Sequence, residues 1–142
     1  MRSLNGSIGL LLAFAVLGSA QSPNPAPAAK VEYGRYLSEE VAKCTGCHTP
    51  NDEKGALDRA KLMKGKVMEY APIEPIKDWH KTSPDITPSG RLWTRWGGEK
   101  ALVKYLTTGL TPKGTLAGPP MPTYKMSQQD AEAIVEYLKT LK

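Results

Sequence analysis

Apolar residues recur at helical spacing in three segments of the chain, and each segment predicts one helix. The first helix is expected over residues 31–43, the second over residues 99–107 and the third after Ser127, which is a good N-cap. The apolar stripes consist of Tyr33, Leu37, Val41 and Cys44 in the first helix, Leu102, Val103 and Leu106 in the second, and Ala131, Ile134, Val135, Leu138 and Leu141 in the third. The sequence shows no convincing strand pattern and no internal repeat. The pattern therefore predicts an all-α fold.

The segments between these helices are rich in proline and glycine, which argues against regular structure there. Residues 51–58 are polar, residues 60–66 fit a short helix or turn, and residues 67–90 contain four prolines. Residues 110–122 form a further loop of the same composition. Loops of this length are unusual in a compact domain. We therefore expect them to wrap a cofactor in place of another helix.

The N-terminus has the layout of a cleavable signal peptide over residues 1–20. Arg2 supplies the positive end, residues 8–17 form an apolar run of the expected length, and small residues precede a cut after Ala20. An uncleaved anchor is the alternative, because the apolar character extends over residues 4–20. Export of the chain predicts a periplasmic protein, either free or tethered by this segment.

Beyond the signal, the composition separates a linker from one domain. Residues 21–29 contain three prolines and predict a flexible linker, whereas residues 30–142 are long enough for one modest core. The formal net charge of the chain is +5, and its basic residues are spread out without a dense run. This distribution argues against nucleic-acid binding, but a mildly basic protein can be steered towards an acidic partner.

The two cysteines of the chain lie three residues apart in the motif Cys44-Thr45-Gly46-Cys47-His48. A redox-active thiol pair normally follows a strand, whereas the residues before Cys44 have a helical pattern. A zinc site needs about four ligands, and the chain contains only two cysteines and two histidines. The third interpretation, which we favour, is the attachment motif of c-type haem.

The spacing of this motif has a physical reason. On one helical turn, residues i, i+3 and i+4 share a face, so Cys44 and Cys47 can reach the two vinyl groups of one haem. His48 then lies under the iron as a ligand. We expect one covalently bound haem c, with its iron, per chain.

The opposite face of the iron needs a second ligand. Met121 is our preferred candidate, because prolines on both sides restrict its backbone and preset the direction of its side chain. Met126 precedes the N-cap Ser127 and fits a hydrophobic staple with Ala131. Among the remaining candidates, Met63 and Met68 are expected to fill gaps around the porphyrin. His80 is expected to face solvent, with a bis-histidine haem as the alternative.

The order of these features resembles the class I (mitochondrial-like) cytochrome c domain over residues 31–142. The segments CTGCHTP, SPDITPSG, YLTTG and PPMPTYKMSQQDAEAIVEYLKTL are similar to haem domains in cytochrome subunits of bacterial membrane-bound alcohol and aldehyde dehydrogenases. The resemblance implies the cytochrome c fold, with three to four helices and long loops around one covalent haem. It also implies that His48 and Met121 are the proximal and distal iron ligands.

The resemblance implies further roles for individual residues. Gly34 matches a small residue where the first and terminal helices cross, with Tyr137 as its packing partner. Trp96 matches an aromatic residue that donates its indole N–H to a haem propionate. Arg91 and Arg95 are cationic candidates for the same propionates, with ordinary surface or core packing as the alternative for all three.

The function expected from these features is electron transfer, without catalysis of its own. An iron with both axial positions filled exchanges single electrons with redox proteins, for which a membrane-bound dehydrogenase and a terminal oxidase are candidates. A haem enzyme or a gas or redox sensor is the alternative if Met121 is displaced from the iron. A thiol oxidoreductase without haem is a third possibility.

Overall fold

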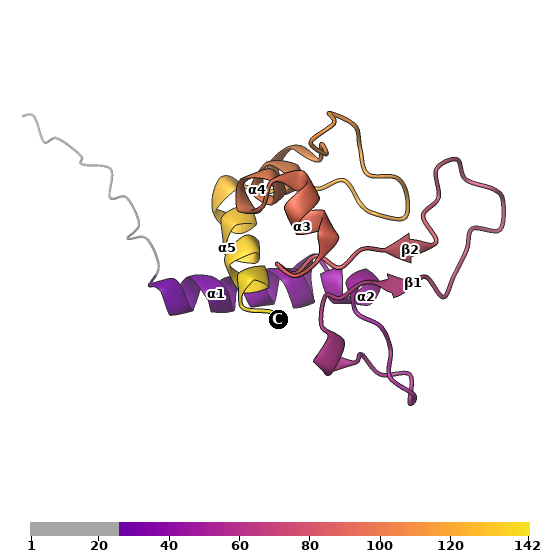
Figure 1. The fold of residues 1–142 in the computed structure, drawn as a ribbon, viewed down its shortest axis with the longest axis horizontal. Helices are drawn as coiled ribbons and strands as arrows, with labels where there is room; N and C mark the ends of the chain where they lie inside the picture. The colour runs from indigo at the N-terminus through magenta and orange to yellow at the C-terminus, as the bar shows by residue number, and fades with distance from the viewer. Residues whose placement is uncertain (1–25) are drawn as a thin grey trace, which may run out of the picture.

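Helices account for most of the regular structure in residues 26–142, the part of the chain that the computed structural model describes (Figure 1). The elements in chain order are α1 (Pro27–Tyr36), the π-helical turn η1 (Leu37–Val41), α2 (Cys44–His48), the 3-10 turn η2 (Arg59–Lys61), β1 (Lys66–Val67), β2 (Thr82–Ser83), α3 (Arg91–Trp96), α4 (Glu99–Thr108) and α5 (Gln128–Lys139). The predicted all-α class is therefore confirmed. The predicted signal peptide lies outside the described residues. Within residues 26–142, no helix combines the length and apolar character needed to cross a membrane.

The first helix differs from its prediction in both extent and buried face. It begins at Pro27, inside the expected linker, where proline is well suited to the first helical position. At its end, the Ala42 N–H donates to the Leu37 carbonyl, five residues back, and closes a π turn. Val41, the last residue of this wider turn, is 55% exposed, and Tyr33 on the preceding turns is 39% exposed. The predicted stripe is wrong at these two positions, although Leu37 is buried.

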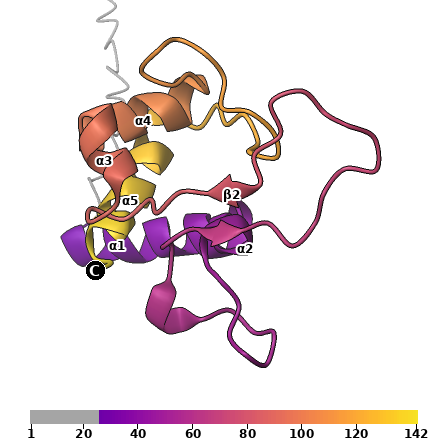
Figure 2. The same cartoon turned by 45° about the vertical axis from the view of Figure 1, so that its right-hand side comes forward.

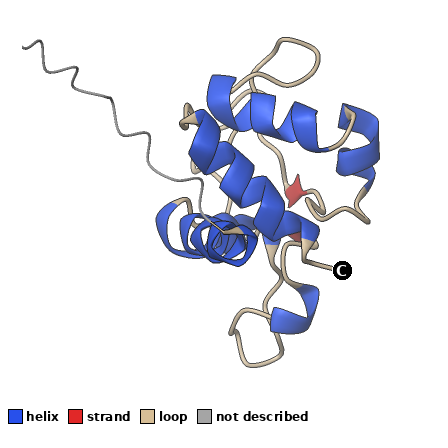
Figure 3. Cartoon of the chain, turned by 90° about the vertical axis from the view of Figure 1, so that its left-hand side faces the viewer, coloured by secondary structure: helices blue, strands red, loops and turns tan. Residues whose placement is uncertain are grey.

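Helix α5 crosses α1, as Figures 1 and 3 show, and the two helices come closest at Gly34. A Cβ atom at Gly34 would overlap the Ala133 carbonyl and lie 3.0 Å from Cβ of Tyr137. Only glycine lets the two helices approach this closely. The predicted crossing of the first and terminal helices at Gly34 and Tyr137 is confirmed.

The core lies between α4, α5 and the end of the first helix. Leu102 and Leu106 are buried as predicted, but Tyr105 is buried where Val103 is only half-buried. In α5 the predicted stripe forms the main wall of the core, and the Ser127 hydroxyl caps the helix by accepting from the Asp130 N–H. Both helices and the N-cap are therefore confirmed, whereas the predicted apolar face of α4 is corrected by the burial of Tyr105.

The loops contain two features that were not predicted, a pair of strands and a short helix. Strands β1 and β2 form a short antiparallel pair, with Lys66 opposite Ser83 and Val67 opposite Thr82. Figure 2 shows the loop between them extending away from the helices. Helix α3 is a six-residue turn of helix that ends at Gly97 in the left-handed conformation. The expectation of no strands is corrected by the β1–β2 pair.

Candidate functional site

A cavity of about 700 Å³ lies between the helical core and the long loops. One side is formed by Leu102, Tyr105 and Leu106 of α4 together with Ile134 and Leu138 of α5. Another side is formed by the motif residues Cys44, Cys47 and His48 of α2. Residues of the long loops complete the lining, among them Met68, Tyr70, His80, Ile86, Leu116, Met121 and Tyr124. The loops thus enclose a largely apolar space, as their length and composition predicted.

Helix α2 brings the predicted haem-attachment residues together on one turn. Cys44, Cys47 and His48 all line the cavity, which is the shared face that their spacing predicted. Both thiols are free, so the motif contains no disulfide. Lys43 precedes the turn with a left-handed φ of 53° and redirects the chain between the π turn and α2.

The His48 ring is fixed by a single hydrogen bond. Its Nδ1 lies 2.8 Å from the Pro84 carbonyl oxygen, which can only accept, so Nδ1 carries the proton and donates. The lone pair of Nε2 is then free for a metal. Burial lowers the pKa of His48, which keeps the imidazole neutral, and a neutral imidazole is the form that binds iron.

The backbone around the motif is tied to the β1–β2 pair. The Ser83 hydroxyl donates to the Cys47 carbonyl and accepts from the Lys66 N–H at 2.9 Å. The Gly65 N–H donates to the His48 carbonyl at 2.7 Å. These bonds hold the loop that carries Pro84 against the motif, and so they fix the acceptor of the His48 proton.

A buried polar cluster stabilises the same loop just beyond Pro84. The Thr87 hydroxyl is fully buried and donates to Asp85 Oδ1 at 2.7 Å. It accepts from Lys64 Nζ at 2.9 Å, and this ammonium also donates to Ser89 Oγ at 2.6 Å. The cluster gives the loop a defined shape without regular secondary structure.

The thiol chemistry of the site disfavours a redox-active cysteine pair. Burial raises the pKa of the Cys44 thiol to about 11. Reactive cysteines have the opposite property, because a lowered pKa is needed to form the thiolate nucleophile at neutral pH. In addition, the segment that precedes Cys44 is a helix and a π turn, where a thioredoxin-like site would have a strand.

The candidates for the distal ligand are separated by the structure. Met121, Met68 and His80 line the cavity, and His80 is otherwise exposed as predicted. Met63 is fully buried in the core rather than beside the cavity, so its predicted role as filler around the porphyrin is wrong. Met126 packs against the core at the start of α5, in keeping with the predicted staple position.

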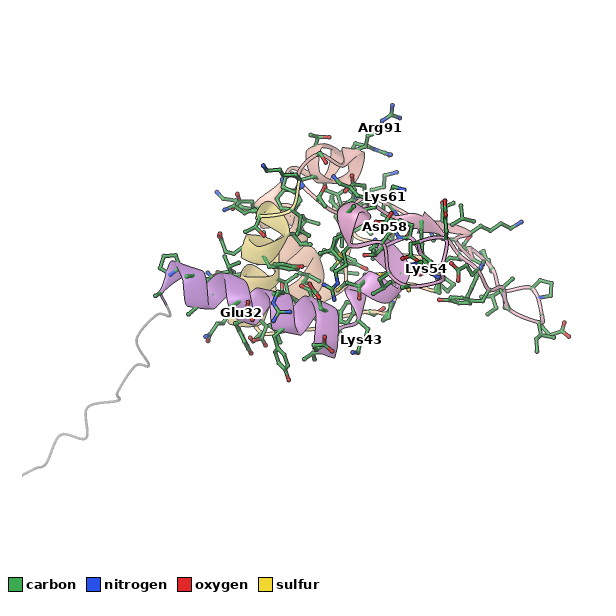
Figure 4. All side chains as sticks on the ribbon, turned by 90° about the horizontal axis from the view of Figure 1, so that it is seen from below. Glu32, Lys43, Lys54, Asp58, Lys61 and Arg91 are labelled. Carbon is green, nitrogen blue, oxygen red and sulfur yellow. The ribbon has the colours of Figure 1, made fainter. Side chains whose placement is uncertain are left out.

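The three residues expected to contact the haem propionates differ in their position relative to the cavity. Trp96 and Arg95 line the cavity, and the Trp96 ring packs edge-on against Tyr105 with 5.1 Å between ring centroids. Arg91 is not among the lining residues, and Figure 4 shows it projecting outward at the edge of the molecule. The prediction that Arg91 reaches the propionates is therefore not supported, because the first turn of α3 points it away from the cavity.

Sequence reasoning missed one polar atom near the cavity. The indole N–H of Trp79 is buried and has no hydrogen-bond partner among the described residues. Its ring packs edge-on against Tyr70, which lines the cavity, with 5.9 Å between centroids. The N–H is closed off from solvent and Trp79 is not among the residues that line the cavity, so this donor does not face the space for a cofactor. No local pattern around Trp79 signals this, because the residue lies in an irregular loop.

A comparison with known protein families agrees with this geometry. The model of the family "Cytochrome c" matches residues 31–142. The chain belongs to the cytochrome c family. Members of this family carry covalently attached haem c, and Cys44, Cys47 and His48 supply the attachment motif here. The cytochrome c domain therefore indicates electron transfer through haem rather than catalysis for this chain.

Several longer proteins are similar to this cytochrome. It is 33% identical over 113 residues to a "Diheme cytochrome c-type" of Cereibacter sphaeroides, covering 76% of the chain and 34% of the relative. It is 32% identical over 124 residues to a nicotinate dehydrogenase subunit of Pseudomonas putida, covering 84% of the chain and 10% of the relative. It is 31% identical over 113 residues to the fructose dehydrogenase cytochrome subunit of Gluconobacter japonicus, covering 76% of the chain and 21% of the relative. The chain thus spans about a third or less of the length of these relatives.

The residues of the cavity fit haem c on three grounds. Two free thiols and a neutral imidazole share one face of the lining. The space of about 700 Å³ has a mainly apolar lining, which suits a flat apolar macrocycle. The Arg95 side chain, which lines the cavity, provides a cationic group for acidic substituents.

Proposed function

We propose that this cytochrome is a periplasmic carrier of single electrons, with one haem ligated by His48 and Met121. The observation that carries the proposal is that His48 of α2 and Met121 of a distant loop line the same cavity. The chain contains two cysteines, which is enough to attach one haem. The expected signal peptide over residues 1–20 supports export to the compartment in which such haems are attached.

Each side of the site has a defined task in this proposal. Haem iron bound in the cavity supplies the one-electron chemistry. His48 presents its Nε2 lone pair because Pro84 holds the Nδ1 proton. Met121 provides a thioether, which raises the reduction potential relative to a second histidine and keeps other ligands from the iron. The apolar side chains of α4 and α5 exclude water from the same space.

The absorption spectrum of the oxidised protein tests this ligand set. We expect the weak far-red band of methionine bound to ferric haem in the unmodified protein and its loss in Met121→Ala. Met126→Ala is the matched control, because Met126 packs at the start of α5 outside the cavity lining, and it should retain the band. A high-spin spectrum of the unmodified protein, or retention of the band in Met121→Ala, would contradict the proposal and favour a haem enzyme or sensor.

A dehydrogenase is the proposed partner. Two of the similar proteins are named as dehydrogenase subunits, and this chain matches only one part of each. Transfer partners of this kind bind over small interfaces. Co-purification with a dehydrogenase from solubilised membranes supports this partner, whereas reduction only by unrelated soluble donors argues against it.

A further inference from the structure

We infer that the Tyr124 hydroxyl is a positioning group for Met121. It holds the Met121 loop, residues 119–126, closed over the cavity by a hydrogen bond to the segment that leads into the haem-attachment cysteines. The inference rests on the proposed ligation by Met121 and names the contact that maintains it. Tyr124 lies three residues after Met121, and both side chains line the cavity.

The contact joins two parts of the chain that are far apart in sequence. The Tyr124 hydroxyl donates to the Ala42 carbonyl oxygen at 2.8 Å, across 82 residues. Ala42 precedes Cys44 by two residues and also lines the cavity. The bond therefore connects the methionine-bearing loop directly to the segment that begins the attachment motif.

The other contacts of the loop are made to different elements. The Pro119 carbonyl accepts from the His80 N–H at 2.7 Å, and the Met126 N–H donates to the Leu106 carbonyl at 3.0 Å. These bonds anchor the two ends of the loop, on the β1–β2 side and on α4. Between these two anchors, Tyr124 holds the loop against the attachment segment, three residues from the proposed iron ligand Met121.

The environment of the hydroxyl makes the bond effective. Tyr124 is half-buried, and burial raises its pKa to about 12, so the hydroxyl keeps its proton and remains a donor. Without this donor, the Ala42 carbonyl has no partner when the loop is closed, but water can reach it when the loop opens. Removal of the hydroxyl therefore favours the open loop, in which Met121 leaves the iron.

Titration of the ferric holoprotein with imidazole tests the inference, because imidazole competes with Met121 for the iron. In Tyr124→Phe we expect about fivefold tighter apparent imidazole binding, corresponding to the loss of one ordinary hydrogen bond. Tyr33→Phe is the matched control: it removes a hydroxyl that donates to Asp130 at 2.9 Å on the exposed side of α1, and it should bind imidazole as the unmodified protein does.

A second background separates positioning of Met121 from a general loss of structure. In a Met121→Ala background, the Tyr124→Phe change should leave imidazole affinity unaltered, because no methionine remains to be displaced. An equal effect in both backgrounds would overturn the inference, as would unchanged affinity of Tyr124→Phe alone. If the unmodified protein lacks the far-red methionine band, then the proposed ligation fails and this inference fails with it. If the band is present but Tyr124→Phe has no effect, then only the inference fails.

Discussion

Single residues decide how closely the helices pack and how the iron ligand is held. Gly34 and His48 illustrate the two cases. Gly34 was expected from the resemblance to lie at a helix crossing, and the overlap of an added Cβ with the Ala133 carbonyl gives the physical reason. His48 was expected from the motif alone, but its acceptor, the Pro84 carbonyl, lies 36 residues away and has no local sequence signal.

Gly34→Ala should destabilise the protein by about 1–3 kcal/mol, because α1 and α5 have to move apart to admit the methyl group. Unfolding of the haem-loaded protein in guanidinium chloride measures this loss. Gly46→Ala is the matched control, because Gly46 is also helical and an added Cβ there meets nothing within 4 Å. Equal unfolding midpoints for the two variants would show that the helices do not depend on the close approach at Gly34.

At the level of elements, predictability follows the range of the interactions that form each one. Helices α4 and α5 carry regular apolar stripes, and α5 has a local N-cap, so the sequence was sufficient to predict both. Helix α3 is short and depends on packing such as that of Trp96 against Tyr105. The β1–β2 pair joins residues 15 to 17 positions apart through a loop, and the π turn is closed by the hydrogen bond from the Ala42 N–H to the Leu37 carbonyl. None of these leaves a periodic pattern.

The loop from Ser83 to Ser89 is irregular beyond β2, and its side-chain contacts help to hold its shape. Thr87→Val removes the hydroxyl shared by Asp85 and Lys64 while keeping the shape of the side chain. We expect a loss of about 1–3 kcal/mol in the free energy of unfolding, because two charged groups lose a partner in a buried site. Thermal unfolding of the haem-loaded protein measures the change.

Thr94→Val serves as the control for this variant, because the Thr94 side chain is on the exposed surface of α3. It should change stability by much less. A Thr87→Val protein as stable as Thr94→Val would mean that the polar cluster does not hold the loop beside His48.

On the scale of the whole molecule, the helices supply an apolar wall and the loops supply most of the polar contacts of the site. The sequence predicted the attachment motif and the cavity-lining position of Met121, because both are local patterns. It did not predict the contacts that hold them, since Tyr124 meets Ala42 across 82 residues. The two arginines of α3 show the same limit, because only the orientation of the helix separates Arg95, which lines the cavity, from Arg91, which does not.

The central claim is that Cys44 and Cys47 attach one haem whose iron His48 ligates. Intact-mass spectrometry of the protein exported from a haem-maturing host, followed by peptide mapping, tests it most directly. We expect the added mass of one haem, carried by the peptide that contains both cysteines. Free thiols, or a disulfide between Cys44 and Cys47 in the exported protein, would contradict it.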